Sequence, residues 1–159
     1  MSAHQARLWA ARACVGAVLF ANVQCAVAFW LSPAGYAPVF ELTGAAGEAA
    51  IRGLAVLFLM WNVPYAVALW HPRRHRLALW QAVAMQALGV AGETLIWWQL
   101  PAAHVVLRGS LLRFILFDAG GLAALCLAAA LMASSFSGPG QLDHEGAKVR
   151  EGTQHEVKA

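Results

Sequence analysis

The chain has 159 residues, of which 60% are hydrophobic and only 12% are charged, and its formal net charge at pH 7 is +3. Soluble domains contain about 45–50% apolar and about 25% charged residues, so this composition excludes an ordinary soluble domain and indicates an integral membrane protein. The basic residues lie near the ends of apolar segments and form no single patch, which excludes nucleic acid as an expected partner.

Four apolar segments are long enough to cross a bilayer, which takes about 20 residues of α-helix. In chain order they are residues 8–31, 50–70, 76–98 and 106–132. A proline follows each segment, as expected where a helix ends. The sequence therefore predicts an all-α fold, a four-transmembrane-helix bundle formed by residues 1–133 of a polytopic membrane protein.

The first segment has a second interpretation, a cleaved signal peptide. Arg7 and Arg12 would form its basic region, and residues 26–28 (Ala-Val-Ala) match a small-x-small cleavage site. Against cleavage, the apolar run continues through residues 29–31, and Asn22 interrupts the apolar centre that a signal peptide requires. We therefore expect this segment to be retained as a membrane span.

The basic residues predict the orientation of the bundle. They gather on one side of a four-span topology: Arg7, Arg12, Arg73, Arg74, Arg76, Lys148, Arg150 and Lys158. Short loops rich in Lys and Arg stay cytoplasmic, so both termini are predicted to lie inside the cell. Arginine far outnumbers lysine, and the chain is also rich in alanine. Both features favour a bacterial source and hence the inner (plasma) membrane.

Residues 134–159 form the last predicted unit. They are polar, contain several glycines and carry charges of both signs. Such a segment has too little apolar surface to order itself, so we predict a disordered cytoplasmic tail.

Polar side chains at membrane depth are the candidate functional residues, because they are costly there and commonly functional. Counting 1.5 Å per residue from each helix centre sorts them into two layers. The layer near the midplane takes one residue from each helix: Asn22, Asn62, Gln86 and Asp118. The layer nearer the outside contains Arg52, Glu93 and Arg113.

Two ion pairs are predicted in the outer part of the bundle. Glu93 and Arg113 have the same computed depth on helices that a short loop makes antiparallel neighbours. Glu48 and Arg52 are one helical turn apart, which places them on the same helix face.

Asp118 has no cation at its depth. Arg113 is five positions away and therefore about 140° around the same helix. The Asp118 carboxyl is thus predicted either to accept hydrogen bonds from Asn22, Asn62 or Gln86, or to be protonated.

The polar layers have two interpretations. Interhelical polar contacts average about 0.6 kcal/mol and commonly serve packing, so the layers would hold the bundle together. Alternatively, they line an outward-facing polar cavity for a small ligand or a proton, with Asp118 at its base. Stripes of small residues favour close helix packing, within the bundle or in a homo-oligomer: Ala17, Ala21, Cys25, Gly120, Ala124 and Ala128.

Several chemistries have no matching pattern. No span contains the histidine pair that a haem between helices needs, and Cys14, Cys25 and Cys126 have no zinc-binding spacing and are interpreted as packing residues. The sequence has no P-loop, no dinucleotide-binding glycine pattern and no Ser/His/Asp arrangement. We therefore predict no catalytic residues, no metal and no cofactor.

The chain resembles small bacterial four-helix membrane proteins of the DoxX-like type. The resemblance covers about residues 8–132: four spans, a break at Ser32-Pro33 after the first, Arg52-Gly53 opening the second, and Gly92-Glu93 late in the third. Some members of that group are described as partners of quinone-linked oxidoreductases. The resemblance implies a membrane accessory role.

Two functions are therefore expected from the sequence. The first is a non-enzymatic accessory or scaffold protein that contacts the lipid bilayer and pairs with a further copy or with a membrane redox partner. The alternative is a small-molecule, quinone or proton-handling membrane protein that uses Glu93, Arg113 and Asp118.

Overall fold

The computed structural model describes residues 2–133, which contain five α-helices and one 3-10 helix. The elements are α1 (Ala3–Leu31), α2 (Pro33–Tyr36), the 3-10 helix η1 (Ala37–Phe40), α3 (Gly44–Trp70), α4 (Arg76–Gln99) and α5 (Val105–Ala133). The all-α prediction is confirmed. The tail predicted for residues 134–159 lies outside the described residues.

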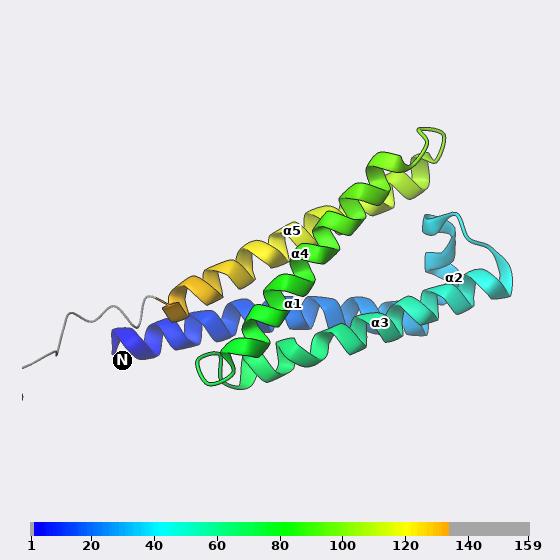
Figure 1. Ribbon diagram of the computed structural model, residues 1–159. Coiled ribbons are helices and arrows are strands. Elements are labelled where there is room, and N and C mark those ends of the chain that lie inside the picture. Colours follow the sequence, from blue (N-terminus) through cyan, green and yellow to red (C-terminus); the bar gives the residue numbers. More distant parts are fainter. Residues whose placement is uncertain (1, 134–159) are drawn as a thin grey trace, which may run out of the picture.

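The four long helices α1, α3, α4 and α5 pack side by side as a bundle (Figure 1). The beginning of α1, the turn between α3 and α4, and the last residues of α5 lie together at what we call the N-terminal end. α2 and η1 lie at the opposite end, where α4 and α5 diverge from α1 and α3. We call residues 33–43 the cap and this opposite end the cap end.

Two helices begin earlier than predicted. The hydroxyl of Ser2 accepts a hydrogen bond from the Gln5 backbone N–H at 3.3 Å, and the Gln5 side chain accepts one from the Ser2 backbone N–H. This reciprocal cap starts α1 at Ala3, five residues before the predicted apolar boundary. α3 begins at Gly44 because the residues from there to Ala50 are mostly alanine, which favours helix.

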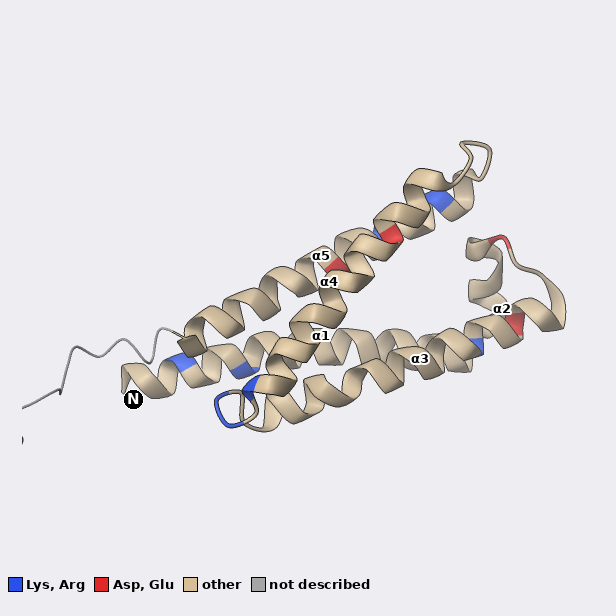
Figure 2. Ribbon diagram, in the orientation of Figure 1, with Lys and Arg blue, Asp and Glu red and all other residues tan. Residues whose placement is uncertain are grey.

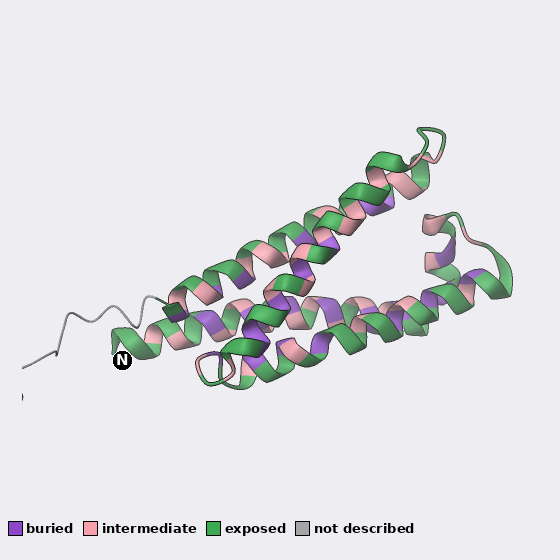
Figure 3. Cartoon of the chain, in the orientation of Figure 1, coloured by how far each residue is buried: buried purple, intermediate pink, exposed green. Residues whose placement is uncertain are grey.

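The core consists of two apolar clusters with a polar layer between them. The cluster near the N-terminal end is built largely from small side chains that let the helices approach closely: Ala11, Val15, Val18, Ala68, Ala78, Ala82 and Ala128, with Tyr65 and Leu125. The cluster at the cap end is aromatic and is centred on Phe29. Buried positions face the bundle axis and exposed ones face outward (Figure 3).

The outward surface is apolar, which is the reverse of a soluble bundle. Phe20 and Leu88 are each 70% exposed, and Trp70 and Trp98 are each 79% exposed. Soluble monomers rarely expose such continuous apolar surface. α1, α3 and α5 are long and apolar enough to cross a membrane, so the chain is a multi-pass helical membrane protein. α4 is not among them, because Gln81, Gln86 and Glu93 lower the mean hydropathy of its central stretch.

Candidate functional site

The predicted midplane layer is buried in the middle of the bundle. Asn22 and Asn62 are each 5% exposed, Gln86 is 4% exposed and Asp118 is 7% exposed. They come from α1, α3, α4 and α5, in that order. The depth count from the sequence therefore identified four buried polar residues, one on each long helix.

Asp118 is held by Gln86 across the interface between α4 and α5. The Gln86 side-chain amide donates to Asp118 Oδ1 at 2.9 Å and to the Asp118 backbone carbonyl at 3.3 Å. The Tyr65 hydroxyl on α3 donates to Gln86 Oε1 at 2.6 Å. One of the three predicted donors to Asp118 is thus confirmed. Tyr65 was not predicted, although its position three residues after Asn62 places both on one helix face.

Two glycines let α4 and α5 approach closely enough for this contact. A Cβ atom on Gly89 would lie 2.5 Å from Asp118 Oδ2, and one on Gly121 would lie 2.7 Å from Gln86 Nε2. Each helix therefore presents a bare backbone to the polar side chain of the other. The bulk of even one methyl group would displace the hydrogen-bonded pair.

The two asparagines form a second link, between α1 and α3. Asn22 Nδ2 donates to Asn62 Oδ1 at 3.4 Å, and Asn62 Nδ2 donates to the Phe58 carbonyl at 2.6 Å. Asn22 Oδ1 is buried and has no hydrogen-bond partner within residues 2–133. This link is long and incompletely satisfied, so it holds its helices less firmly than the Tyr65–Gln86–Asp118 chain.

The predicted outer layer divides between two places. Glu93 and Arg113 form no ion pair in the described part of the chain: Arg113 donates to Ser110 Oγ at 3.1 Å, and Glu93 Oε2 is buried without a hydrogen-bond partner. The two side chains point in different directions. Glu93 lies one turn after Gly89, on the face of α4 that meets Asp118, whereas Arg113 faces the cap. Equal depth did not imply contact.

The second predicted ion pair is confirmed. Arg52 lies 3.5 Å from Glu48, one turn away on α3, and both side chains are exposed. Exposed pairs of this kind contribute little to stability. Among residues 2–133, no ion pair or hydrogen bond joins Arg52 to Glu93 or Arg113.

A pocket of about 340 Å³ lies at the cap end between α1, α5 and the cap. Five of its ten lining residues are aromatic, namely Phe29, Tyr36, Phe40, Phe114 and Phe117, and three others, Arg113, Ser110 and Cys25, add polar atoms. Phe29 fixes the wall, since its ring centre lies 4.8 Å from that of Tyr36 and 5.9 Å from that of Phe40. Of the predicted site residues, only Arg113 lines this pocket.

The cap is fastened to the start of α5 by three polar contacts. Ser110 Oγ donates to the Val39 carbonyl at 2.7 Å. The Glu41 carboxylate, on the one described non-glycine residue with a left-handed backbone, accepts from His104 Nδ1 at 2.5 Å and from the Leu107 backbone N–H at 3.3 Å. No sequence pattern indicated these contacts, because their partners are more than 60 residues apart and none carries a recognisable motif.

Acid should loosen the cap. The hydrogen bond with His104 holds the pKa of the Glu41 carboxyl below its ordinary value of 4.5. Because the pKa is lowered in the folded protein, the contribution of Glu41 is fully present above pH 4.5 and is lost as the pH falls through the lowered pKa. We expect amide protection factors in the cap, measured by hydrogen exchange, to be constant from pH 7 to 5 and to fall at lower pH.

Two variants check this expectation at pH 7. Glu41→Gln should show the low cap protection that the parent shows in acid. Glu48→Gln should leave the cap unchanged, because Glu48 pairs with Arg52 on α3 and not with the cap. Parent-like protection of the cap in Glu41→Gln would mean that the carboxylate does not fasten it.

Comparisons with known proteins assign no family, because no family model, no curated protein and no solved structure matches the chain. The DoxX-like resemblance is therefore unsupported. Within residues 2–133, no group of three or more His, Cys, Asp or Glu side chains is placed to hold a metal ion. The site has to be interpreted from its own geometry.

Proposed function

We propose that the protein is a non-enzymatic accessory protein of the bacterial inner membrane, which binds a small amphipathic molecule in the pocket at the cap end. The pocket is the observation that carries this proposal. Its volume of about 340 Å³ falls within the range of about 300–1,000 Å³ that is usual for small-molecule sites. Its lining, mostly apolar with a few polar groups, is also typical of such sites.

A four-span topology is part of the proposal, with α4 as the fourth span. At 1.5 Å per residue the 24 residues of α4 extend about 36 Å, which exceeds a hydrocarbon core of about 30 Å. α4 packs along α3 and α5, and its outward side chains are as apolar as theirs, with Leu77 74% and Leu88 70% exposed. A helix with this surface fits lipid better than water.

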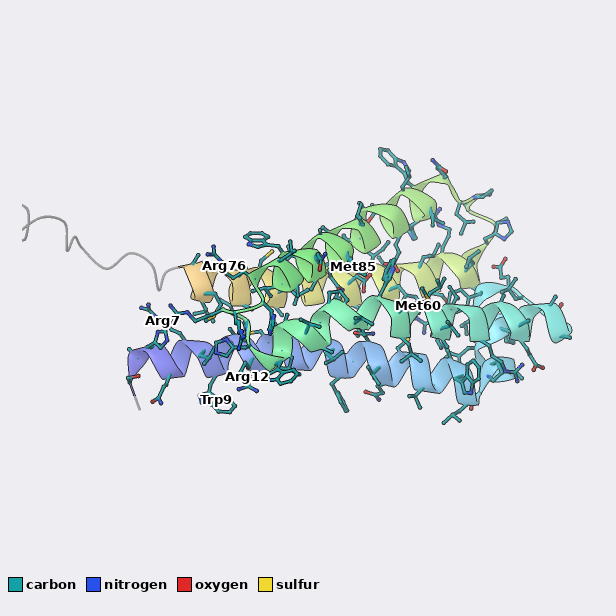
Figure 4. All side chains as sticks on the ribbon, turned by 60° about the horizontal axis from the view of Figure 1, so that its bottom comes forward. Arg7, Trp9, Arg12, Met60, Arg76 and Met85 are labelled. Carbon is teal, nitrogen blue, oxygen red and sulfur yellow. The ribbon has the colours of Figure 1, made fainter. Side chains whose placement is uncertain are left out.

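Charge supports an orientation with the N-terminal end in the cytoplasm. Basic residues dominate that end of the bundle, while the acidic residues of the described chain lie toward the middle and the cap end (Figure 2). Arg7, Arg12 and Arg76 gather there with Trp9, whose ring lies 4.8 Å from the Arg12 guanidinium (Figure 4). The cap and the pocket then face the periplasm.

Reporter fusions test the topology. We expect a fusion after Ala159 to be active as a cytoplasmic reporter, and an alkaline phosphatase inserted between Ala102 and Ala103 to be active in the periplasm. An inactive phosphatase in that loop, together with a periplasmic carboxyl terminus, would show that only α1, α3 and α5 cross the membrane.

Filling the pocket tests the binding proposal. Thermal unfolding of the purified protein in dodecyl maltoside would be followed with added dodecan-1-ol, dodecylamine or dodecanoate. We expect at least one probe to raise the unfolding temperature of the parent saturably. Val39→Phe adds bulk to the pocket wall. It should lower the apparent affinity for that probe at least about tenfold, because the probe then loses apolar burial in the pocket.

Val27→Phe is the matched control, because Val27 is 46% exposed on α1 and does not line the pocket. It should keep the response of the parent. If no probe acts saturably on the parent, or if Val39→Phe responds like Val27→Phe, the pocket is not a binding site.

Glu93 and Asp118 support a second candidate function, proton handling. Side chains on a helix lean toward its N-terminus, so Glu93 leans toward Gly89, the backbone position that Asp118 Oδ2 approaches. Two carboxyls that converge away from water cannot both be ionised and tend to share a proton. If they titrate, the unfolding temperature of the parent should depend on pH more strongly than that of the Glu93→Gln/Asp118→Asn double variant. Equal pH profiles would exclude this candidate.

A further inference from the structure

We infer that the ligand of the cap-end pocket is an anionic amphiphile, whose charged head meets Arg113 and whose apolar body lies against the phenylalanine wall. The inference rests on the proposed function, because it takes the pocket as a binding site and names the class of molecule that fits it. Its chemistry is shared by a fatty acid carboxylate and by the phosphate of an anionic lipid.

Among residues 2–133, Arg113 is a cation without a counter-charge. The guanidinium donates to the uncharged hydroxyl of Ser110 at 3.1 Å. Each acidic residue between positions 2 and 133 is engaged elsewhere or faces elsewhere: Glu41 contacts His104, Glu48 contacts Arg52, and Glu93 and Asp118 lie at the interface of α4 and α5. Arginine at membrane depth is costly and usually finds a partner, so a negative charge is missing from this place.

The geometry of the side chain favours a carboxylate or phosphate. A guanidinium presents five N–H donors in a planar fork that matches the paired oxygens of these groups. The single hydrogen bond to Ser110 leaves most of those donors for a ligand. Ser110 is 1% exposed, and its hydroxyl is held by the Val39 and Val106 carbonyls. It therefore positions the guanidinium without neutralising its charge.

The rest of the pocket suits an apolar body. Phe29, Phe40 and Phe114 form one connected wall, with ring centres 5.8–6.2 Å apart. Phe117, one turn beyond Arg113 on α5, lines the pocket and is 39% exposed on the outer surface. A molecule dissolved in the bilayer therefore has a route to the pocket along α5, with its head toward Arg113 and the cap.

Binding of matched probes tests the inference. Dodecanoate and dodecan-1-ol have the same chain length and differ in head charge, and each would be titrated into the protein in dodecyl maltoside at pH 8. We expect the parent to bind dodecanoate about tenfold more tightly than the alcohol, which is the gain from one charge-assisted hydrogen-bonding pair. This comparison uses the parent alone and so does not depend on how any variant folds.

Variants then assign the preference to Arg113. Arg113→Gln should lower dodecanoate affinity about tenfold and so remove the preference for dodecanoate over the alcohol. Arg52→Gln is the matched control, because Arg52 is also an arginine on the cap-end half of a long helix but does not line the pocket. It should keep the full preference.

The outcomes separate the two proposals. Saturable binding with no preference for dodecanoate, or a preference that survives in Arg113→Gln, overturns the anionic class and leaves the pocket. No saturable binding of either probe overturns the proposed function itself. Competition between dilauroyl phosphatidylglycerol and dodecanoate supports a lipid headgroup as the source of the anion, and its absence supports a free acid.

Discussion

Adding a single methyl group to Gly89 is expected to destabilise the bundle in detergent. The new Cβ atom would lie 2.5 Å from Asp118 Oδ2, so either the carboxylate or the α4 backbone has to move. The carboxylate is not free to swing away, because the Gln86 amide holds its other oxygen at 2.9 Å. We expect Gly89→Ala to lower the free energy of unfolding by about 1–3 kcal/mol, the usual cost of overpacking a tight core.

Gly92 provides a matched control on the same helix. It lies three residues further along α4, and a Cβ atom there would have no neighbour within 4 Å. Gly92→Ala should therefore be neutral or stabilise the helix by up to about 1 kcal/mol, since alanine restricts the unfolded chain more than glycine does. Equal unfolding temperatures for the two variants would show that α4 and α5 do not approach as closely as the structure indicates.

The midplane layer was predictable because its cause is local to each helix. A polar residue in the middle of an apolar run must face inward, and the depth of Asn22, Asn62, Gln86 and Asp118 follows from counting along the helix. The sequence limited the hydrogen-bond donors of Asp118 to three candidates but did not select one of them. Gln86 reaches Asp118 because Gly89 faces α5 and Gly121 faces α4. The rotation of each helix about its own axis sets these directions. An apolar pattern does not predict that rotation when apolar residues occur on every face of the helix.

The pocket and the cap were not predictable for a different reason. Residues 33–43 contain two prolines and were expected to end a helix, yet they form a short α-helix and a 3-10 turn that fold back on α5. The contacts that hold them join Glu41 to His104, 63 positions along the chain. Single-sequence patterns carry no information about such pairings, which arise only when the long helices are packed.

The direction of the Arg113 side chain was also not predictable from the sequence. Its depth matched that of Glu93, and an ion pair was the expected way to offset two charges in a membrane. In the structure the Glu93 side chain, on α4, is turned toward Asp118, whereas the Arg113 side chain, on α5, is turned toward the cap. A sequence gives height in the bilayer more reliably than direction around a helix, and the function of a charge depends on both.

Substitutions of Asp118 are expected to have the other large effect, and they separate hydrogen bonding from charge. Asp118→Leu removes the oxygen that accepts from Gln86 at 2.9 Å and places a branched side chain against the bare backbone of Gly89. The Gln86 amide then keeps only its 3.3 Å contact with the backbone carbonyl of residue 118. Losing a hydrogen bond to a carboxylate costs about 1.5–3 kcal/mol, and overpacking adds about 1–3 kcal/mol. We expect this variant to lose more than about 2 kcal/mol of stability and to unfold well below the parent in a detergent melt.

Asp118→Asn should behave differently, because an asparagine keeps the shape of the side chain and one oxygen for Gln86. If Asp118 supplies hydrogen bonding between α4 and α5, the free energy of unfolding of this variant should lie within about 1 kcal/mol of that of the parent, which is the size of one ordinary hydrogen bond. The contrast between the two variants is the decisive measurement. Equal losses in Asn and Leu would mean that the ionised carboxylate itself stabilises the bundle, which requires a cation or a water-filled path that reaches Asp118 from outside.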